Sequence, residues 1–590
     1  MKQFLKYFFA SLLGTISALI LLMVLSFFFM MGLVAMLDTD ETVTISPNTI
    51  LRLELKSELA ERSYFDPTGI PDIFSPDIGK KMGLNDVVKN IKKAKEDDNI
   101  PGIFIDLDDM NAGAWPILEP IRNSLLEFKQ SGKFIIAHGN SITQKAYYLG
   151  SVADSIFLTP TGDMDFKGLY AELTFFKKTL EKLDIEAQVI KVGKFKSAVE
   201  PFIRDKMSDA NRLQIKEFIN SENNYLLSKI SESRKISVDE LKKVQDNLLV
   251  QSPEDAIKYK LVDGLKYQVE VDEYLKSLTG KKPDEKLKTV SLKKYMKVEG
   301  KEKPYSSNRI AVIYAVGEIN GSKGDETTIG KENIVKAIRK ARNNKNVKAI
   351  VMRVNSPGGS ALISDIIWKE VELTKKEKPF LVSYSKYAAS GGYYISCGAD
   401  KIIAEPTTLT GSIGVFALIP NTQKFFDNKL GITFDKVMTG KYSDYISGIR
   451  RLTNYEKQVL QKQVNRIYKQ FVSNVATGRN MDYDAVDKIG EGRIWSGLQA
   501  KELGLVDELG GLDKAIEMAV DIAGIENYRV VEYPEIRDPF EVFFETLLDD
   551  ASQKVFGSEI NHVIEHYSSA LNLLKGSKVQ ARLPFEMDEF

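Results

Sequence analysis

The chain has 590 residues, which at roughly 100 to 200 residues per domain predicts several domains and excludes a small peptide or a lone binding module. Basic and acidic residues each total 81, so no net charge draws the chain to nucleic acid, which is not an expected partner. One cysteine, Cys397, and three histidines are too few for a disulfide framework or a structural zinc site. Oxygen ligands for a hard cation remain available, but no metal and no other cofactor is expected.

The N-terminal segment predicts a transmembrane anchor. Lys2 and Lys6 precede an uncharged, apolar stretch at 7–37, which exceeds the ~20 residues that a helix needs to cross a bilayer. The alternative is a cleaved signal peptide, whose apolar region would be shorter, at about 7 to 15 residues. Because lysines precede the stretch and acidic residues follow it at 38–41, we expect a cytoplasmic N-terminus and external domains.

The remainder of the chain contains an internal sequence repeat. The two copies keep an offset of about 244 to 247 residues over most of their length, which predicts two homologous domains. The matching segments are 99–107 with 346–354, 134–137 with 380–383, 147–149 with 393–395, 153–154 with 399–400, 183–185 with 430–432, 193–195 with 440–442, and 256–263 with 500–507.

Short apolar runs alternate with helix-length segments in each copy, as is typical of βα units on a largely parallel sheet, so the fold class is α/β. In the second copy the expected strands are 349–354, 380–384 and 401–404, and the expected helices are 331–343, 361–376 and 455–478. The predicted organisation is a cytoplasmic stub and anchor at 1–40, a first domain at 41–280, a basic linker at 281–308, a second domain at 309–525, and a C-terminal extension at 526–590.

Three glycine-bearing turns follow strand-like runs in the second copy, at 355–360, 388–392 and 410–414. The glycines at 358–359 can turn sharply and present backbone N–H groups to a carbonyl, as an oxyanion hole requires. Ser390 stands among small residues where a substrate could approach it, and Ser412 could offer a hydroxyl nearby. The alternative for Ser390 is a packing turn without chemistry.

A reactive serine needs a base, and histidine is scarce. His562 and His566 lie in the C-terminal extension, and His138 ends a buried-looking strand of the first copy, where a structural role is the better interpretation. Cys397 is expected to be a small core residue. No Gly-x-Ser-x-Gly elbow surrounds Ser390, so an α/β-hydrolase triad is disfavoured.

Lysine is the remaining common base, provided that burial lowers its pKa by roughly three units from about 10.4. Lys196, in the segment 193–201, is singled out. Its local sequence does not separate it from Lys191 or Lys194, and a solvated lysine is the alternative. The neighbouring Ser197 could hydrogen-bond within a site or cap a turn.

Taken together, these motifs resemble the signal peptide peptidase A family, also called protease IV, in its long, duplicated, membrane-anchored form. That family is peptidase family S49, within the ClpP/crotonase-like superfamily. The resemblance extends from the anchor to about residue 525, and it is carried by the segments 196–201, 353–360, 388–393 and 409–414.

The resemblance implies that Ser390 is the nucleophile, Lys196 the general base, and Ser412 a hydrogen-bond partner of the lysine. It also implies that backbone N–H groups at Gly359 and Gly391 bind the oxyanion. The implied fold is a tandem pair of ClpP/crotonase-like domains built of ββα repeats, and the implied assembly is a homotetramer.

The function that the resemblance implies is a membrane-anchored serine endopeptidase. It would degrade cleaved signal peptides and other apolar peptides on the outer, periplasmic face of the bacterial inner membrane, held there by residues 7–37. Two alternatives remain, namely a crotonase-type acyl-CoA enzyme and a catalytically inactive, membrane-anchored assembly scaffold.

The repeat gives an independent reason to expect one shared site. At the observed offset, Ser390 corresponds to Gln144 and Lys196 corresponds to Ser443. Each copy therefore lacks what the other has, as expected if a single composite dyad forms between the domains.

Overall fold

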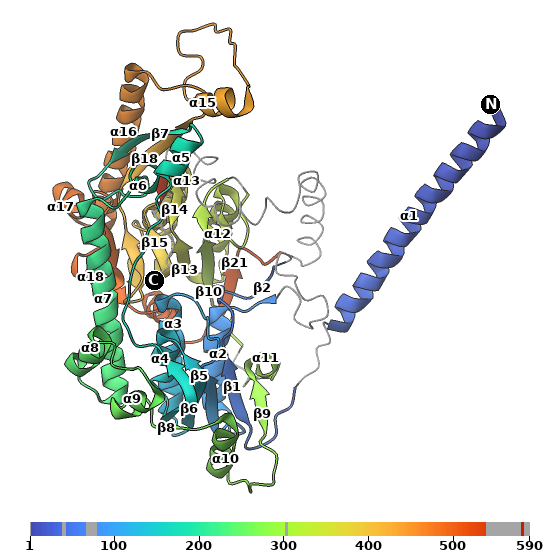
Figure 1. The fold of residues 1–590 in the computed structure, drawn as a ribbon, viewed down its shortest axis with the longest axis vertical. Coiled ribbons are helices and arrows are strands. Elements are labelled where there is room, and N and C mark those ends of the chain that lie inside the picture. The colour runs from blue at the N-terminus through green and yellow to red at the C-terminus, as the bar shows by residue number, and fades with distance from the viewer. Residues whose placement is uncertain are drawn as a thin grey trace.

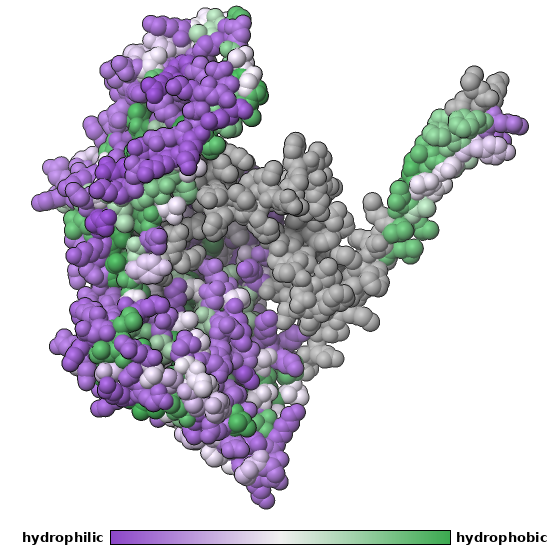
Figure 2. Space-filling view, viewed as in Figure 1, coloured by the Kyte–Doolittle hydropathy of each residue, from purple (hydrophilic) through white to green (hydrophobic). Residues whose placement is uncertain are grey.

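The computed structural model describes residues 2–37, 43–66, 80–300, 305–321, 323–537 and 580–582. The helix α1 (Lys2–Leu37) projects away from the body of the molecule (Figure 1), and most of its coloured surface is hydrophobic in Figure 2. Among the residues described, no helix qualifies as long and apolar enough to span a membrane. The anchor thus stays a prediction.

The first repeat is built on a six-stranded sheet in which all neighbouring strands are parallel. In spatial order its strands are β8 (Gly264–Leu265), β6 (Ser155–Met164), β5 (Phe134–Ile142), β4 (Gly102–Asp106), β1 (Ile50–Glu54) and β9 (Thr289–Ser291). Its helices are α2 (Leu84–Glu96), α3 (Trp115–Lys129), α4 (Gln144–Gly150), α5 (Lys177–Lys182), α6 (Glu200–Ile203), α7 (Asp209–Arg234), α8 (Val238–Asp246), α9 (Pro253–Lys258), α10 (Gln268–Leu278) and α11 (Leu292–Tyr295).

The second repeat contains a corresponding but larger sheet of eight strands, in which only β19 is antiparallel to its neighbour. Its main path is β19 (Ile494–Ser496), β17 (Leu409–Gly411), β15 (Phe380–Ala389), β13 (Val347–Ser356), β10 (Arg309–Val316) and β21 (Arg529–Tyr533). In addition, β16 (Lys401–Ala404) pairs with β15, and β20 (Glu508–Leu509) pairs with β16. Its helices are α12 (Lys331–Asn343), α13 (Ala361–Thr374), α14 (Gly391–Tyr394), α15 (Gln423–Phe425), the π-helix η2 (Phe426–Leu430), α16 (Asn454–Arg479), α17 (Tyr483–Ile489), α18 (Gly497–Glu502) and α19 (Leu512–Ala523). The duplication predicted from the sequence is therefore visible as two α/β units.

The central strand of the second repeat shows why its sequence is almost continuously apolar. All ten residues of β15 are buried, and separate apolar clusters cover the two faces of the sheet. Parallel sheets packed on both faces favour such runs over alternating patterns. Ser390 follows this rigid strand directly, which fixes the position of its backbone.

Two strands at sheet edges lie outside the domains predicted from the sequence. Within the expected linker at 281–308, Thr289–Ser291 forms β9 against β1, and α11 follows it. Within the expected C-terminal extension, Arg529–Tyr533 forms β21 against β10. Each is the outermost strand of its sheet, and strands of three and five residues are too short for their periodicity to stand out from a lysine-rich or polar context. The domain boundaries themselves stay a prediction.

A third sheet joins the two repeats. Its order is β12 (Thr328–Ile329), β11 (Glu318–Ile319), β14 (Gly358–Ser360), β22 (Gln580–Arg582), β18 (Val415–Asn421) and β7 (Glu186–Val192). The strand β7 belongs to the first repeat and pairs along seven residues with β18 of the second. A separate pair of short strands, β2 (Tyr64–Phe65) and β3 (Lys80–Lys81), lies near the junction of the repeats.

The long helix α7 of the first repeat also packs on the second repeat and runs along one side of the body in Figure 1. Phe218 of α7 shares a buried cluster with Tyr387, Leu409 and Ile494. Across the same contact, a hydrogen bond connects the hydroxyl oxygens of Ser221 and Ser496, which lie 2.8 Å apart. The interface between the repeats is thus a continuous part of the core, and it holds the loop after β7 against the second repeat.

Candidate active site

Ser390 occupies a constrained turn between β15 and α14. Its backbone has φ 55° and ψ −113°, which is unusual for a residue with a Cβ, and its N–H donates to the Gly411 carbonyl at 2.8 Å. Such strained positions persist where the surrounding structure holds them, and they concentrate at functional sites. The helix that follows has only four residues, so its dipole contributes less than a long helix would.

Lys196 reaches Ser390 from the first repeat. It lies in the loop between β7 and α6, and its Nζ is 2.8 Å from Ser390 Oγ. The same Nζ lies 3.0 Å from Ser412 Oγ and 3.3 Å from the Ser412 carbonyl oxygen. All three side chains are at most 1% exposed. The structure therefore brings together the three side chains singled out in the sequence.

Burial is the physical cause that adapts this lysine to act as a base. It lowers the pKa of the Lys196 ammonium well below the usual value, and no carboxylate of the described residues forms an ion pair that would oppose this. A neutral amine at 2.8 Å can accept the proton of a serine hydroxyl.

The two other lysines near Lys196 have different surroundings. The Lys191 ammonium donates to the Lys196 carbonyl oxygen at 3.1 Å, and the Lys194 ammonium lies 5.4 Å from the centre of the Phe195 ring. Only Lys196 of the three hydrogen-bonds to Ser390 in the structure described. Contacts between the repeats therefore distinguish Lys196 from Lys191 and Lys194, which the local sequence did not.

Two glycines leave the space that the lysine occupies. A Cβ on Gly492 would lie 2.6 Å from Lys196 N and 2.7 Å from its Cα, and a Cβ on Gly414 would lie 3.1 Å from Lys196 Cδ. Gly492 also has φ +82°, which disfavours other residues. Sequence reasoning missed Gly492. Only the pattern Gly490–Gly492 marks it in the sequence, and that pattern indicates a turn without indicating which loop it meets.

Gln214 on α7, also missed from the sequence, fixes the loop that carries the lysine. Its amide nitrogen donates to the Phe195 carbonyl at 3.1 Å and to Ser197 Oγ at 2.8 Å. Its amide oxygen accepts the Ile494 N–H at 3.2 Å. Ser197 therefore accepts a hydrogen bond from Gln214 beside the site. Through the same buried glutamine, the loop that carries Lys196 is held against the second repeat.

The predicted oxyanion donors lie side by side. Gly359 N is 3.1 Å from the position that a Cβ on Gly391 would take, and Gly391 N is 2.7 Å from the corresponding position on Gly358. Gly358 and Gly359 have φ of 101° and 151°, so glycine is needed to bring this turn against the residue after Ser390. Backbone N–H groups placed next to a nucleophile can stabilise a tetrahedral oxyanion.

The first repeat holds no second copy of this arrangement in the part of the chain that is described. Gln144, which corresponds to Ser390, accepts backbone N–H groups of Lys167 and Gly168 at 3.1 and 3.0 Å. Ser443, which corresponds to Lys196, lies exposed in a turn with Gly440. These residues have structural roles, and the chemically suitable groups gather at one place.

The remaining candidates also have structural positions. His138 is buried and contacts the Lys266 carbonyl at 3.0 Å and Thr159 Oγ1 at 3.2 Å. Cys397 is fully buried, and burial raises the pKa of its thiol, which disfavours a thiolate. His562 and His566 lie outside the described residues.

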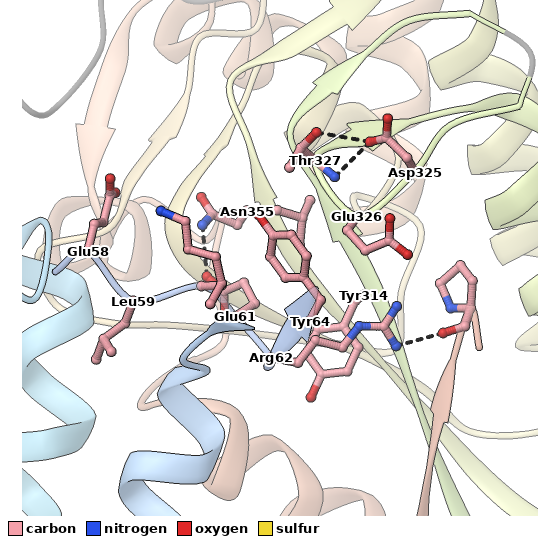
Figure 3. Close-up of a pocket in the computed structure, with 14 residues that line it drawn as sticks. Glu58, Leu59, Glu61, Arg62, Tyr64, Tyr314, Asp325, Glu326, Thr327 and Asn355 are labelled. Atoms are coloured by element: carbon pink, nitrogen blue, oxygen red, sulfur yellow. Dashed lines mark hydrogen bonds between the residues drawn. The ribbon is translucent and has the colours of Figure 1, made fainter. Parts of the chain in front are cut away.

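A separate pocket of about 210 Å³ opens at the junction of the repeats (Figure 3). Arg62 crosses it, stacks 5.0 Å from the centre of the Tyr314 ring, and donates to the Pro534 carbonyl at 2.6 Å. The residues that line it include Asn355 but none of the three side chains around Lys196 Nζ. It borders the turn at 355–360 and does not contain Ser390.

Comparison with known proteins agrees with this geometry. The sequence pattern described as "Peptidase family S49" matches residues 127–282 and 372–526, one segment in each repeat. Protease 4 of Salmonella typhi is 36% identical over 470 residues, covering 78% of this chain and 75% of that protein. The chloroplastic serine protease SPPA of Arabidopsis thaliana is 32% identical over 511 residues, covering 85% and 74%.

Among solved structures, an N165D mutant of ClpP1 from Listeria monocytogenes aligns with 17% identity and a TM-score of 0.24, over 35% of this chain and 94% of that one. Two observations decide the family: the match on both repeats, and the similarity to these two relatives over about three quarters of the length of each. The chain is a serine protease that belongs to peptidase family S49.

Proposed function

We propose that this protease uses a dyad of Ser390 and Lys196, assembled between the two repeats, to hydrolyse peptide bonds. The observation that carries the proposal is the 2.8 Å contact between Lys196 Nζ and Ser390 Oγ in a fully buried setting. Ser412 acts as a positioning residue, because its hydroxyl hydrogen-bonds to the lysine amine.

In the proposed mechanism, neutral Lys196 accepts the hydroxyl proton of Ser390 as Oγ attacks the peptide carbonyl carbon. The N–H groups of Gly359 and Gly391 stabilise the oxyanion of the tetrahedral intermediate. The Lys196 ammonium then protonates the leaving amine, which leaves an ester on Ser390. Water, deprotonated by Lys196, hydrolyses this ester and regenerates the free hydroxyl.

We also propose that the apolar segment 7–37 anchors the chain in the bacterial inner membrane, with the protease domains on the periplasmic side. The lysines before this segment and the acidic residues after it support that orientation. A protease at this surface is well placed to degrade remnant signal peptides, which are apolar and are released at the membrane. Another member that resembles part of the chain, from Enterococcus faecium, is named a putative signal peptide peptidase.

A homotetramer is the proposed assembly. An exposed apolar segment that begins at the last residue of η2 supports association between copies, because monomers seldom leave so many large apolar side chains in solvent. Its members are Leu430, Ile432, Phe434, Val437, Met438 and Tyr442. Light scattering of the protein lacking residues 1–39 tests the tetramer, and a monomer at micromolar concentration would refute it.

The activity is tested with an unfolded, apolar-rich peptide and the protein lacking residues 1–39. Ser390→Ala and Lys196→Ala should each abolish hydrolysis, since loss of a general base alone costs about 10²- to 10⁴-fold. Lys194→Ala is the matched control, because it changes a lysine of the same loop that does not contact Ser390. Undiminished activity of Lys196→Ala would refute the dyad. If the unaltered protein labels with no serine-reactive acyl probe, an inactive scaffold becomes the better interpretation.

A further inference from the structure

Arg493 of the second repeat contacts two aromatic rings that belong to different repeats. Its guanidinium carbon is 4.9 Å from the centre of the Phe195 ring and 4.2 Å from the centre of the Trp495 ring. A guanidinium group within about 6 Å of an aromatic ring is attracted to the ring face, and its planar shape allows stacking. Phe195 belongs to the first repeat and directly precedes Lys196. Arg493 therefore contacts the loop of the lysine from the opposite repeat.

The same guanidinium forms an ion pair with a helix of the first repeat. Arg493 Nη2 donates to Glu217 Oε2, and the two side chains are 21% and 42% exposed. Glu217 lies on α7 about one turn after Gln214, which binds the Phe195 carbonyl. Helix α7 also contacts β19, the strand that begins one residue after Arg493. Two separate elements of the first repeat thus meet at this one side chain.

The backbone of Arg493 holds the residue that hydrogen-bonds to the lysine amine. Its carbonyl oxygen accepts the Ser412 N–H at 2.6 Å. Two residues earlier, the Glu491 carbonyl accepts the Phe195 N–H at 2.9 Å. This short segment therefore bonds both to the loop that carries Lys196 and to the loop that carries Ser412.

The fit of the lysine loop against the second repeat keeps the amine dry. Burial is the cause that lowers the pKa of the Lys196 ammonium, so a loosened loop would admit water and return this pKa toward its ordinary value. Arg493 Nε is buried and has no hydrogen-bond partner among the described residues, so stacking and the Glu217 ion pair position the guanidinium. Arg493 thus supports the loop by contacts of its side chain.

We propose that Arg493 is a positioning residue for the proposed reaction, which holds the loop of Lys196 against the second repeat and keeps the lysine amine away from water. The inference rests on the proposed function, because it concerns the same dyad. Arg493 acts through Phe195 and through the backbone of Ser412, and it is not itself a catalytic residue. The competing explanation is that Arg493 stabilises the fold without affecting the dyad.

Arg493→Met tests this role, because methionine keeps an unbranched apolar side chain but removes the charge and the planar group. Hydrolysis of the apolar-rich peptide should lose about 10- to 100-fold in kcat, since a shift of about 1 Å in a catalytic group can cost about 10²-fold. The acidic limb of kcat/KM against pH, which reports protonation of Lys196, should move upward by about one unit or more, because full burial lowers a lysine pKa by up to about 3–5 units. Arg493→Lys retains a charge for Glu217 and should recover part of the activity.

Arg234→Met is the matched control. It removes an arginine ion pair, with Asp263 at 2.8 Å, that lies within the first repeat. It should lower the thermal midpoint of unfolding without moving the acidic limb. Glu217→Gln removes only the charge of the partner on α7, so it should move the limb in the same direction as Arg493→Met but by less. This milder variant keeps the test valid if Arg493→Met disturbs the fold.

A double variant tests whether the effect passes through the aromatic contact. Effects of residues in direct contact are not additive, so Phe195→Leu combined with Arg493→Met should lose little more kcat than Arg493→Met alone. Fully additive losses would overturn the proposed path through Phe195.

A stability measurement follows the lysine without catalysis. The free energy of unfolding of the unaltered protein, relative to Lys196→Met, should rise between pH 7 and pH 10, and the corresponding difference in the Arg493→Met background should rise less. This readout needs no peptide, so it separates failure of the present inference from failure of the dyad. If Arg493→Met leaves both the acidic limb and this stability difference unchanged, the proposal is overturned, and a lower thermal midpoint alone would show that Arg493 only stabilises the fold.

Discussion

Arg353 and Glu61, which lie in different repeats, form a buried ion pair. Arg353 Nε donates to Glu61 Oε2 at 2.8 Å, and the two side chains are 1% and 2% exposed. Asn355 Nδ2 donates to the other oxygen of Glu61 at 2.8 Å. The first repeat thereby holds the end of β13, from which the turn to Gly358 and Gly359 starts.

Glu61→Ala should destabilise the protein strongly. Removing one partner of a buried ion pair leaves an uncompensated charge, and such changes cost about 3–5 kcal/mol. The change is measured as a lower midpoint of thermal or denaturant unfolding. Glu54→Ala is the control, because it removes a more exposed ion pair, with Arg52, in the same repeat, and such pairs contribute only about 0–1 kcal/mol. Equal effects of the two substitutions would contradict the assigned role of Glu61.

The rate of peptide hydrolysis should rise with pH through the lowered pKa of Lys196. Below that pKa the lysine is an ammonium and cannot accept the Ser390 proton, whereas above it the amine is neutral. The profile of kcat/KM against pH should therefore have an acidic limb well below pH 10, and Lys194→Ala should leave the limb in place. An acidic limb at the ordinary pKa of lysine would contradict the inferred burial of a neutral amine.

The same burial links folding stability to pH. At a pH above the lowered pKa of the folded chain, the unfolded chain keeps the Lys196 proton that the folded chain has lost, so unfolding takes up a proton and stability rises with pH. This continues from the lowered folded pKa up to the unfolded value of about 10.4. Lys196→Met removes the titrating group, so the stability of the unaltered protein relative to this variant should increase between pH 7 and pH 10. A pH-independent difference would show that burial does not alter the protonation of Lys196.

The sequence predicted the parts of this protein that are fixed by local pattern and by repetition. The expected strands at 349–354, 380–384 and 401–404 fall within β13, β15 and β16, and the expected helix at 331–343 is α12. The constant offset between the copies predicted the two matching sheets. Each of these signals needs only neighbouring residues or a comparison of the chain with itself.

Features that depend on distant contacts could not be predicted in the same way. Lys196 is distinguished from Lys191 by a partner 194 residues away, and no property of its own loop encodes that choice. Gly492 is required because the lysine loop passes over it, and Gln214 matters because α7 packs on the second repeat. The place of Gln580–Arg582 depends on two strand edges formed elsewhere in the chain. The resemblance to a known family, and not local pattern, singled out Lys196 in advance.

Gly492→Ala should lower activity by displacing Lys196. The new Cβ would meet Lys196 backbone atoms at 2.6 to 2.7 Å, and a shift of about 1 Å in a catalytic group can cost about 10²-fold. The left-handed backbone adds a strain of about 1–2 kcal/mol. Gly504→Ala is the matched control, since Gly504 has a similar φ of +76° and only Met481 Sδ, at 3.8 Å, near its Cβ position. We expect both variants to lose stability but only Gly492→Ala to lose kcat, and equal activity of the two would contradict this account.

The second repeat should be inactive by itself, although it carries Ser390 and both glycine N–H groups. Purified residues 305–590 lack Lys196, so hydrolysis of the apolar-rich peptide should fall at least about 100-fold, as for loss of a general base. Removal of α7 exposes the apolar cluster that includes Tyr387 and Leu409, which is buried in the whole protein. Circular dichroism therefore establishes first whether the fragment is folded. Lys196→Ala in the full chain reproduces the chemical loss without exposing that surface. Hydrolysis by residues 305–590 at the rate of the whole protein would show that the base lies within the second repeat.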